Sequence, residues 1–206
     1  MAQAKLNNIS SFISFTVLVV FGVIQLSDAQ YITLGLCPRI GGMRDFNISR
    51  YEGLWYEVEK YWFAVEATAS CTNVRYVANP DGTFGVEINM LEEITRTKMS
   101  MPGVTWYRSR DGSADFMLDL LVTQSPIPFH FKYPYLVLDT DYDNYTIKYL
   151  CKQLGPFSAQ TMWVLSREKS LSPESREHIY NFLRRVGINV QKLRRSNTST
   201  CGDIGK

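Results

Sequence analysis

The chain has 206 residues, of which 45% are hydrophobic and 13% aromatic, and its 22 basic and 20 acidic residues give a net charge of +2 at pH 7. This near balance argues against nucleic acid as a partner, because phosphate backbones are bound by a clustered excess of Lys and Arg. The length suits one domain that is large enough to bury its own core.

The N-terminus has the pattern of a secretory signal. Lys5 precedes an apolar run from Phe12 to Leu26, and Ser27-Asp28-Ala29 then places small residues where cleavage occurs. A membrane anchor is the alternative, but a membrane-spanning helix needs ~20 apolar residues, and this shorter run has no basic flank after it. We therefore predict a signal peptide over residues 1–29 and a secreted, extracellular domain over residues 30–206.

Four cysteines, Cys37, Cys71, Cys151 and Cys201, follow the predicted signal. In an oxidising compartment this even number indicates two disulfides, and their spacing leaves all three possible pairings open. A zinc site is the other common use of four cysteines, but the chain has no C-x-x-C spacing and the gaps are too long for a compact metal loop. We expect two disulfides and no metal site.

Three N-glycosylation sequons also follow the predicted signal. They begin at Asn47, Asn144 and Asn197, in the sequences N-I-S, N-Y-T and N-T-S. Each predicts a glycan if the asparagine lies on the surface.

Between Leu54 and Arg167, short runs rich in β-branched and aromatic residues alternate with turn signals at roughly ten-residue intervals. Pro80-Asp81-Gly82 is a hairpin turn, because Asp-Gly supplies the positive φ of a tight turn. The predicted strands are about 54–63, 70–78, 83–91, 94–101, 104–109, 115–123, 132–139, 144–151 and 160–167. The pair on either side of Pro102-Gly103 forms either two strands or one bent strand. Such a set closes into a barrel or packs as a two-sheet sandwich, and periodicity does not separate these folds.

The pattern changes to a helix after the last strand. Ser172 is a capping residue, with Pro173 at the first helical position and Glu174 in the first turn. An apolar stripe follows at helical spacing, made by Ile179, Phe182, Leu183 and Val186, and Gly187 ends it. We predict one amphipathic helix over about 173–186, packed outside the β structure, and a polar tail to residue 206 that is held by a disulfide at Cys201.

Catalytic signals are weak. The two histidines, His130 and His178, have the surroundings of solvated side chains, and no nucleophile-elbow, metalloprotease or phosphate-loop motif occurs. Cysteines that are all paired leave no thiol nucleophile. The sequence therefore predicts neither an enzyme nor a cofactor site.

Two groups of carboxylates resemble binding or catalytic sites, but their sequence context favours structural roles. Asp139, Asp141 and Asp143 lack the glycine and the terminal glutamate of an EF-hand loop, so they predict a turn stabilised by aspartate side chains. Glu57 and Glu59 lie two apart on a strand, a spacing typical of a solvated face.

One strand shows a clear inward row. Phe116, Leu118, Leu120 and Val122 alternate with Asp115 and Asp119 on the other face. A packed core and a ligand cavity would both produce this row, so composition alone does not decide between them.

Three motifs in fixed order decide the fold. They are Gly53-Leu54-Trp55-Tyr56, Thr140-Asp141-Tyr142 and Trp163-Val164-Leu165-Ser166-Arg167. Together they resemble the lipocalins, and the chain from Cys37 to Cys201 resembles the apolipoprotein D and Lazarillo-like branch, with insect bilin-binding proteins and, more distantly, retinol-binding protein as relatives. The resemblance implies an all-β, eight-stranded antiparallel up-and-down barrel over about 53–167, with one C-terminal α-helix outside it.

The resemblance also assigns structural roles. It implies disulfides between Cys37 and Cys151 and between Cys71 and Cys201, and it places Arg167 over the ring of Trp55 in a cation-π contact. The implied structural motif residues are Gly53, Trp55, Thr140, Asp141, Tyr142 and Arg167.

Trp163 matches a pocket tryptophan of this branch, which sets the inward face of the neighbouring strands and places Thr161 on it. The ligand-binding residues expected on these faces are Phe116, Leu118, Leu120, Tyr135, Val137, Thr146, Lys148, Trp163 and Leu165. Lys148 departs from the branch, which usually has a neutral residue there, and a lysine in an apolar calyx is costly unless it is paired. We expect it to meet a ligand carboxylate or to lie near the mouth; the alternative is that it reaches solvent or pairs internally.

The function that the resemblance implies is binding and transport of a small hydrophobic ligand, such as a fatty acid, retinoid, sterol or bilin, in an apolar calyx. A secreted signalling or protein-interaction lipocalin is the alternative, and a prostaglandin-isomerase type of enzyme would need a free thiol inside the barrel. Ser125-Pro126-Ile127-Pro128-Phe129 is a candidate loop for contact with a lipoprotein particle or membrane surface. A cell-surface receptor is a further candidate partner.

Overall fold

The computed structural model describes residues 31–62, 66–123, 127–198 and 201. The predicted signal peptide, Ser125 and Pro126 of the candidate loop, and the tail after Cys201 lie outside these residues. No helix in the described ranges is long and apolar enough to cross a membrane.

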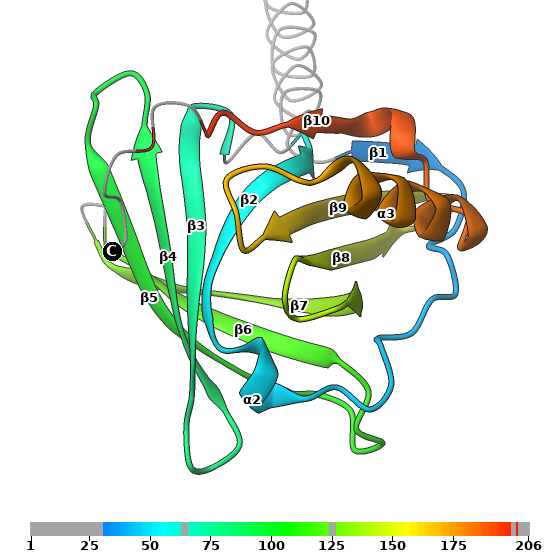
Figure 1. The fold of residues 1–206 in the computed structure, drawn as a ribbon, viewed down its shortest axis with the longest axis horizontal. Helices are drawn as coiled ribbons and strands as arrows, with labels where there is room; N and C mark the ends of the chain where they lie inside the picture. The colour runs from blue at the N-terminus through cyan, green and yellow to red at the C-terminus, as the bar shows by residue number, and fades with distance from the viewer. Residues whose placement is uncertain (1–30, 63–65, 124–126, 199–200, 202–206) are drawn as a thin grey trace, which may run out of the picture.

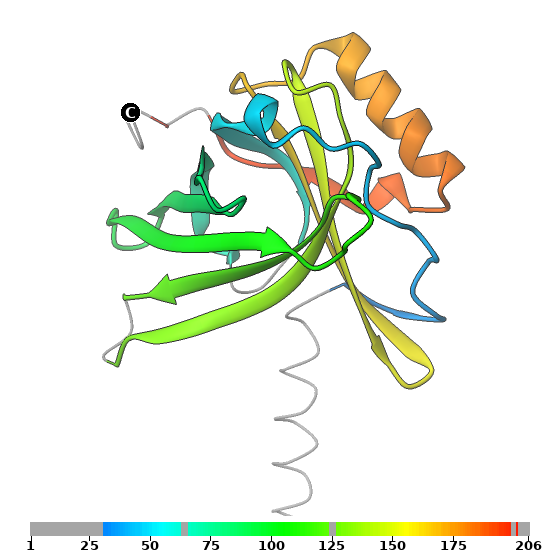
Figure 2. The same ribbon diagram turned by 90° about the horizontal axis from the view of Figure 1, so that it is seen from below.

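The described strands form one curved antiparallel sheet that closes on itself (Figures 1 and 2). Its order is β1-β9-β8-β7-β6-β5-β4-β3-β2-β10, and a further pairing of β9 with β2 closes an eight-stranded barrel from β2 to β9. The strands are β1 (Tyr31–Leu34), β2 (Gly53–Tyr61), β3 (Ala69–Ala78), β4 (Phe84–Glu92), β5 (Lys98–Tyr107), β6 (Asp115–Val122), β7 (Phe129–Thr140), β8 (Tyr145–Leu154), β9 (Phe157–Ser166) and β10 (Leu193–Arg195). The helices are α2 (Ile48–Tyr51), α3 (Pro173–Arg185) and the 3-10 turn η3 (Val190–Lys192). The predicted fold class is therefore confirmed.

Two hydrophobic clusters divide the core. On β4 the buried side chains of Phe84, Val86 and Ile88 alternate with the half-buried Gly85 and the exposed Glu87, so one face of the strand turns inward. The inner cluster lies inside the barrel, and the outer cluster lies between the barrel wall and α3. The barrel wall therefore separates the side chains of the interior from those that pack against α3.

Helix α3 lies on the outside of the barrel, as predicted (Figure 2). The Ser172 hydroxyl accepts a hydrogen bond from the backbone N–H of Ser175, and Pro173 begins the helix. Ile179 and Leu183 of the stripe are fully buried in the outer cluster, with Phe182 and Val186 packed at its edge. The amphipathic stripe thus supports the wall and takes no part in the interior.

The three sequence motifs that carry the resemblance, which contain Trp55, Asp141 and Arg167, meet at one end of the barrel and close it. The guanidinium of Arg167 lies 3.7 Å from the centre of the Trp55 ring, which is fully buried. The same guanidinium donates to the backbone carbonyls of Leu54, at 3.0 Å, and Tyr142, at 3.0 Å. The predicted Trp55–Arg167 contact is confirmed, and Gly53, with φ +94°, lies directly beside Arg167.

The predicted aspartate-stabilised turn is also present. The Asp141 carboxylate accepts backbone hydrogen bonds from Asp143 at 3.2 Å, Asn144 at 2.8 Å and Tyr145 at 3.0 Å. The Thr140 hydroxyl accepts from the backbone of Tyr142. These contacts hold the β7–β8 hairpin and explain the T-D-Y motif without a ligand.

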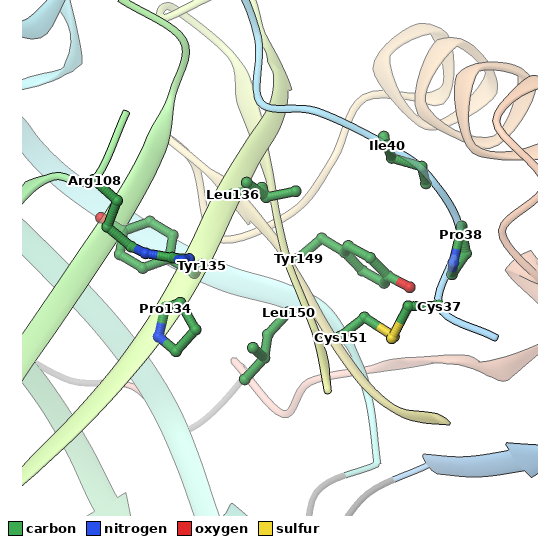
Figure 3. Close-up of a pocket in the computed structure, with 10 residues that line it drawn as sticks. All are labelled: Cys37, Pro38, Ile40, Arg108, Pro134, Tyr135, Leu136, Tyr149, Leu150 and Cys151. Atoms are coloured by element: carbon green, nitrogen blue, oxygen red, sulfur yellow. A yellow bond between two sulfur atoms is a disulfide. The ribbon is translucent and has the colours of Figure 1, made fainter. Parts of the chain in front are cut away.

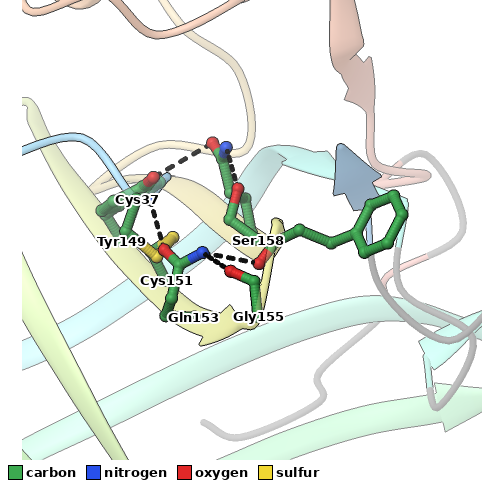
Figure 4. The surroundings of a disulfide bond; sticks show 8 residues. Cys37, Tyr149, Cys151, Gln153, Gly155 and Ser158 are labelled. Carbon is green, nitrogen blue, oxygen red and sulfur yellow. Dashed lines mark hydrogen bonds between the residues drawn. A yellow bond between two sulfur atoms is a disulfide. The ribbon is translucent and has the colours of Figure 1, made fainter. Parts of the chain in front are cut away.

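Both implied disulfides are present, Cys37 with Cys151 and Cys71 with Cys201, and no cysteine is free. Around the first pair, the backbone N–H of Cys37 donates to the side-chain oxygen of Gln153 at 2.8 Å. The side-chain nitrogen of Gln153 donates to the Gly155 carbonyl (Figure 4). The second pair ties the C-terminal segment to β3. Each disulfide joins an N- or C-terminal segment to the barrel, as expected.

Removal of the Cys71–Cys201 bond, by changing both residues to serine, is expected to lower the free energy of unfolding by about 2 to 4 kcal/mol, because the cross-link restricts the unfolded chain. Urea denaturation monitored by fluorescence measures this. A midpoint equal to that of the unaltered protein would show that the C-terminal segment contributes nothing to barrel stability.

Of the two alternatives left open at Pro102-Gly103, the single strand is correct. These residues lie inside β5, where Pro102 pairs with Glu87, so the two runs on either side form one strand. A Cβ on Gly103 would lie 2.5 Å from the backbone oxygen of Asp119 on the neighbouring strand. Glycine is therefore needed for close strand contact, not for a turn. Strands β1 and β10, which flank the barrel, were not predicted.

Candidate ligand-binding site

The structure brings all nine expected ligand-binding residues to the barrel interior, and each is buried. Seven belong to the inner hydrophobic cluster: Phe116, Leu118, Leu120, Tyr135, Val137, Trp163 and Leu165. Thr146 and Lys148 lie on the same face of β8, where Thr146 is paired with Leu165 and Lys148 with Trp163. The predicted inward faces of the strands are therefore correct, whereas contact with a ligand stays a prediction.

Some of these nine side chains pack against the closed end. The Thr146 hydroxyl lies 3.1 Å from the hydroxyl of Tyr51, and the Phe116 ring lies 5.4 Å from that of Phe46. Both partners precede or form α2, which lies at the end of the barrel where Trp55 is buried (Figure 1). Thr146 and Phe116 thus contribute to an aromatic floor, below the part of the interior that lies toward the open end.

Lys148 lies in the middle of this interior and is only 4% exposed. Its amine donates to the Tyr76 hydroxyl at 3.0 Å and lies 4.1 Å from the Tyr135 ring centre and 5.8 Å from that of Trp163. The expectations that it lies near the mouth or reaches solvent are wrong. It is enclosed by aromatic side chains from three other strands because β8 directs it inward.

A second polar group lies on the other side of Trp163. Lys60, which pairs with Trp163 across β2 and β9, forms salt bridges with Glu57 at 2.9 Å and Glu66 at 2.8 Å. The indole N–H of Trp163 donates to Glu66 at 3.4 Å. The calyx tryptophan is therefore flanked by two lysines, of which only Lys60 has carboxylate partners among the described residues.

The predicted solvated face for Glu57 and Glu59 is wrong, because both are 1% exposed. A register shift between the two residues at Val58 places them on opposite faces of β2. Glu57 meets Lys60, while Glu59 accepts from Arg176 at 2.9 Å and from Tyr180 at 2.8 Å on α3. Each buried carboxylate thus has a partner, as burial requires.

Burial also changes the protonation of these groups. Desolvation lowers the pKa of Lys148 to about 7, although Glu66 and Glu57 act in the opposite direction. Desolvation, together with Glu66, raises the pKa of Glu57 to about 7 despite the attraction of Lys60. For Lys60 the two carboxylates outweigh desolvation and raise its pKa.

Several interior residues were missed from the sequence. Tyr76 and Tyr133 contact the site from β3 and β7, and both pKa values are raised by burial. Met90, Met99 and Met101 also pack in the inner cluster. The alternating pattern of β4 could have identified Met90. Glu66 carries no such signal, because it lies in the connection between β2 and β3.

A pocket of about 160 Å³ lies between β7 and β8, beneath the N-terminal segment (Figure 3). The two strands pair only from Leu136 to Thr140 on β7, so they separate toward the open end. Pro134 and Leu150 line the pocket from the two strands, and Cys37 and Pro38 cover it from the N-terminal segment. Tyr135 of the inner cluster also lines this pocket, so the pocket adjoins the barrel interior.

Comparison with known proteins identifies the family. A family model described as a lipocalin-like domain matches residues 46–198. The chain belongs to the lipocalin family. Relatives of this lipocalin include apolipoprotein D of Mus musculus, 26% identical over 184 residues that cover 89% of this chain and 93% of the relative. The bilin-binding protein of Pieris brassicae is 29% identical over 185 residues, 85% of this chain and 91% of the relative.

The lipocalin fold is also found in solved structures. Insecticyanin from Manduca sexta aligns with a TM-score of 0.73 and 22% identity, over 83% of this chain and 90% of that one. The resemblance to the apolipoprotein D branch is therefore confirmed at the level of family and fold.

The open end of this lipocalin is rimmed by exposed apolar side chains. The connections at this end, opposite Trp55, follow β2, β4, β6 and β8. In the described parts of these connections and at the adjoining strand ends, the exposed large hydrophobic residues are Trp62, Ile94, Ile127, Phe129, Leu154 and Phe157. Each connection at the mouth thus has an exposed apolar side chain within it or at a strand end beside it.

Proposed function

We propose that this lipocalin is a secreted carrier that binds one small hydrophobic molecule in its calyx and performs no chemistry on it. The observation that supports this most is the aromatic interior around Trp163, which offers apolar walls from Leu120, Tyr133 and Tyr135 and a few polar groups. Binding would gain ~25 cal/mol for each Å² of apolar surface removed from water. Relatives named for bilin binding support the same class of ligand.

Polar groups in the interior would orient the ligand. Lys148 and Thr161 are the proposed contacts, since the buried Thr161 hydroxyl has no hydrogen-bond partner among the described residues. A buried polar atom without a partner is destabilising unless a ligand or water supplies one. The ligand classes proposed are fatty acids, retinoids, sterols and bilins.

Tryptophan fluorescence tests this proposal. Trp163 lies in the calyx, whereas Trp106 is half-buried on β5, between inward Thr105 and Tyr107. We expect saturable quenching by at least one member of a panel of fatty acids, retinoids, sterols and biliverdin. Trp163→Phe should remove more than half of the quenching, and the matched control Trp106→Phe should retain it.

Three outcomes would decide against parts of the proposal. Complete absence of saturable quenching with the whole panel would favour the signalling or protein-interaction alternative. Unchanged fatty-acid and bilin affinities in Lys148→Met would remove Lys148 from the ligand contacts. The enzyme alternative requires a free thiol, which both disulfides disfavour; one reactive cysteine per folded chain in a thiol titration would revive it.

The rim of exposed apolar residues supports a second interaction, with a lipoprotein particle, a membrane surface or a cell-surface receptor. Ile127 and Phe129, from the candidate loop, are part of it. Flotation with phosphatidylcholine vesicles tests the lipid-surface form of this proposal, and protein that stays wholly unbound would contradict it.

Secretion and glycosylation remain proposals with structural support. Two disulfides are typical of an oxidising compartment, and Asn47, Asn144 and Asn197 are all exposed. The Asn144 amide donates to Asp141 at 2.7 Å and that of Asn197 to Glu93 at 3.2 Å, so a glycan there would replace these bonds.

A further inference from the structure

The amine of Lys148 has surroundings unlike those of a lysine held for structure. It is enclosed by Tyr76, Tyr135 and Trp163, and its one hydrogen-bond partner among the described residues is the Tyr76 hydroxyl, at 3.0 Å. The neighbouring carboxylates of Glu57 and Glu66 bind Lys60 instead. A buried amine without a carboxylate partner is costly to the fold.

The buried amine of Lys148 can react as a nucleophile. Desolvation lowers the pKa of Lys148 to about 7, so a substantial fraction of the amine is uncharged at neutral pH. An uncharged lysine amine in an apolar site is a nucleophile toward carbonyl groups. The environment thus combines reactivity with a calyx suited to apolar molecules.

We propose that Lys148 binds lipophilic aldehydes covalently and reversibly, as an imine inside the calyx. The amine nitrogen forms a bond to the aldehyde carbon to give a carbinolamine. The carbon–oxygen bond then breaks, and the oxygen leaves as water with the two amine hydrogens, which leaves a carbon–nitrogen double bond. No oxidant or reductant is involved. This inference rests on the proposed function, because the aldehyde must first enter the calyx.

The neighbours of Lys148 suit each stage of this reaction. The Tyr76 hydroxyl is within hydrogen-bond distance of the nitrogen and is placed to pass a proton to the departing oxygen. The ring of Tyr135, 4.1 Å away, would stabilise a protonated imine by a cation-π contact. Both rings are buried, so bulk water that would hydrolyse the imine is restricted.

Reductive trapping tests the inference on the full secreted chain. The protein is incubated with dodecanal and sodium cyanoborohydride, which reduces an imine to a stable amine, and is then analysed by intact mass and peptide mapping. We expect one adduct per chain, at Lys148, in the unaltered protein and in Lys152→Met, a control that removes an exposed lysine from the same strand. Lys148→Met and Lys148→Arg should reduce this adduct at least tenfold.

Dodecanol separates this inference from the proposed function, because it matches dodecanal in length and cannot form an imine. If dodecanol quenches tryptophan fluorescence saturably but dodecanal labels only exposed lysines, with equal yield in Lys148→Met, the imine is overturned and the carrier function stands. If neither molecule binds, the imine is overturned, whereas the carrier function is overturned only if the panel of fatty acids, retinoids, sterols and biliverdin also fails to bind. Peptide mapping of the unaltered protein keeps the test decisive even if a Lys148 variant fails to fold.

Discussion

Replacement of Arg167 by methionine is expected to lower the free energy of unfolding by about 3 kcal/mol. The change removes a cation-π contact with Trp55, at 3.7 Å, typically worth ~0.5–2 kcal/mol. It also removes the donors to the carbonyls of Leu54 and Tyr142, and an acceptor left without a donor costs about 1–3 kcal/mol where it is buried. Urea denaturation measures the loss.

Arg167→Lys is the matched control for this change. It keeps the positive charge but loses the planar fork that reaches several carbonyls at once, so it should recover less than half of the lost stability. Ligand affinity of the folded Arg167→Met protein should be unchanged, since this contact lies at the closed end. An Arg167→Met protein as stable as the unaltered one would show that the motif does not hold the barrel floor.

Replacement of Lys148 by methionine is expected to have the opposite effect and to raise the free energy of unfolding at pH 7, by about 1 to 4 kcal/mol. Exchange of a buried polar group for an apolar one of similar volume removes a desolvation penalty. The pKa of Lys148 is lowered from 10.5 in the unfolded chain to about 7 in the fold, so the unfolded state binds more protons between these values. The penalty is fully present below about pH 7.

The pH dependence distinguishes this cause from simple packing. As pH rises from about 7 toward 10.5, the stability of the unaltered protein should rise by up to ~1.4 kcal/mol per pH unit from Lys148. The advantage of Lys148→Met should therefore shrink across this range. Tyr76, Tyr135, Glu57 and Glu66, which face Lys148, are common to both proteins and cancel to first order.

Denaturation at pH 7, 8 and 9 measures this difference, with Lys152→Met as a control on an exposed lysine that should show little change. An advantage of Lys148→Met that stays constant over the three pH values would mean that Lys148 is charged throughout. Glu57 has the opposite effect on the pH dependence of stability. Its pKa is raised from 4.5 to about 7, so the folded state binds more protons between these values and the free energy of unfolding falls as pH rises through this interval.

The barrel fold was more predictable from the sequence than the side-chain contacts in its interior. Trp55, Arg167 and the Thr140-Asp141-Tyr142 turn make local or family-specific contacts, which recur with the motif and were placed correctly. The inward rows followed from strand alternation once Trp163 set the face. The helix followed from its Ser172 cap and apolar stripe, because these are local signals.

The errors arise where a long-range contact overrides a local signal. At Pro102-Gly103 the local signal leaves two strands or one strand open, and β5 continues through it with the backbone of β6 close to Gly103. Glu57 and Glu59 read as one solvated face, but the irregularity at Val58 separates them. Strand alternation placed Lys148 on the inward face, but its depth depends on Tyr76, Tyr135 and Trp163, which lie on three other strands, so no local pattern indicates how completely it is enclosed.

A carrier function requires that the calyx holds a single hydrophobic molecule. Native mass spectrometry of the folded protein after incubation with the panel of fatty acids, retinoids, sterols and biliverdin tests this most directly. We predict a complex of one ligand per chain with at least one of these classes, reduced in Trp163→Phe and retained in Trp106→Phe. Free protein alone with every class, or multiple ligands bound equally by both variants, would contradict a carrier function for this calyx.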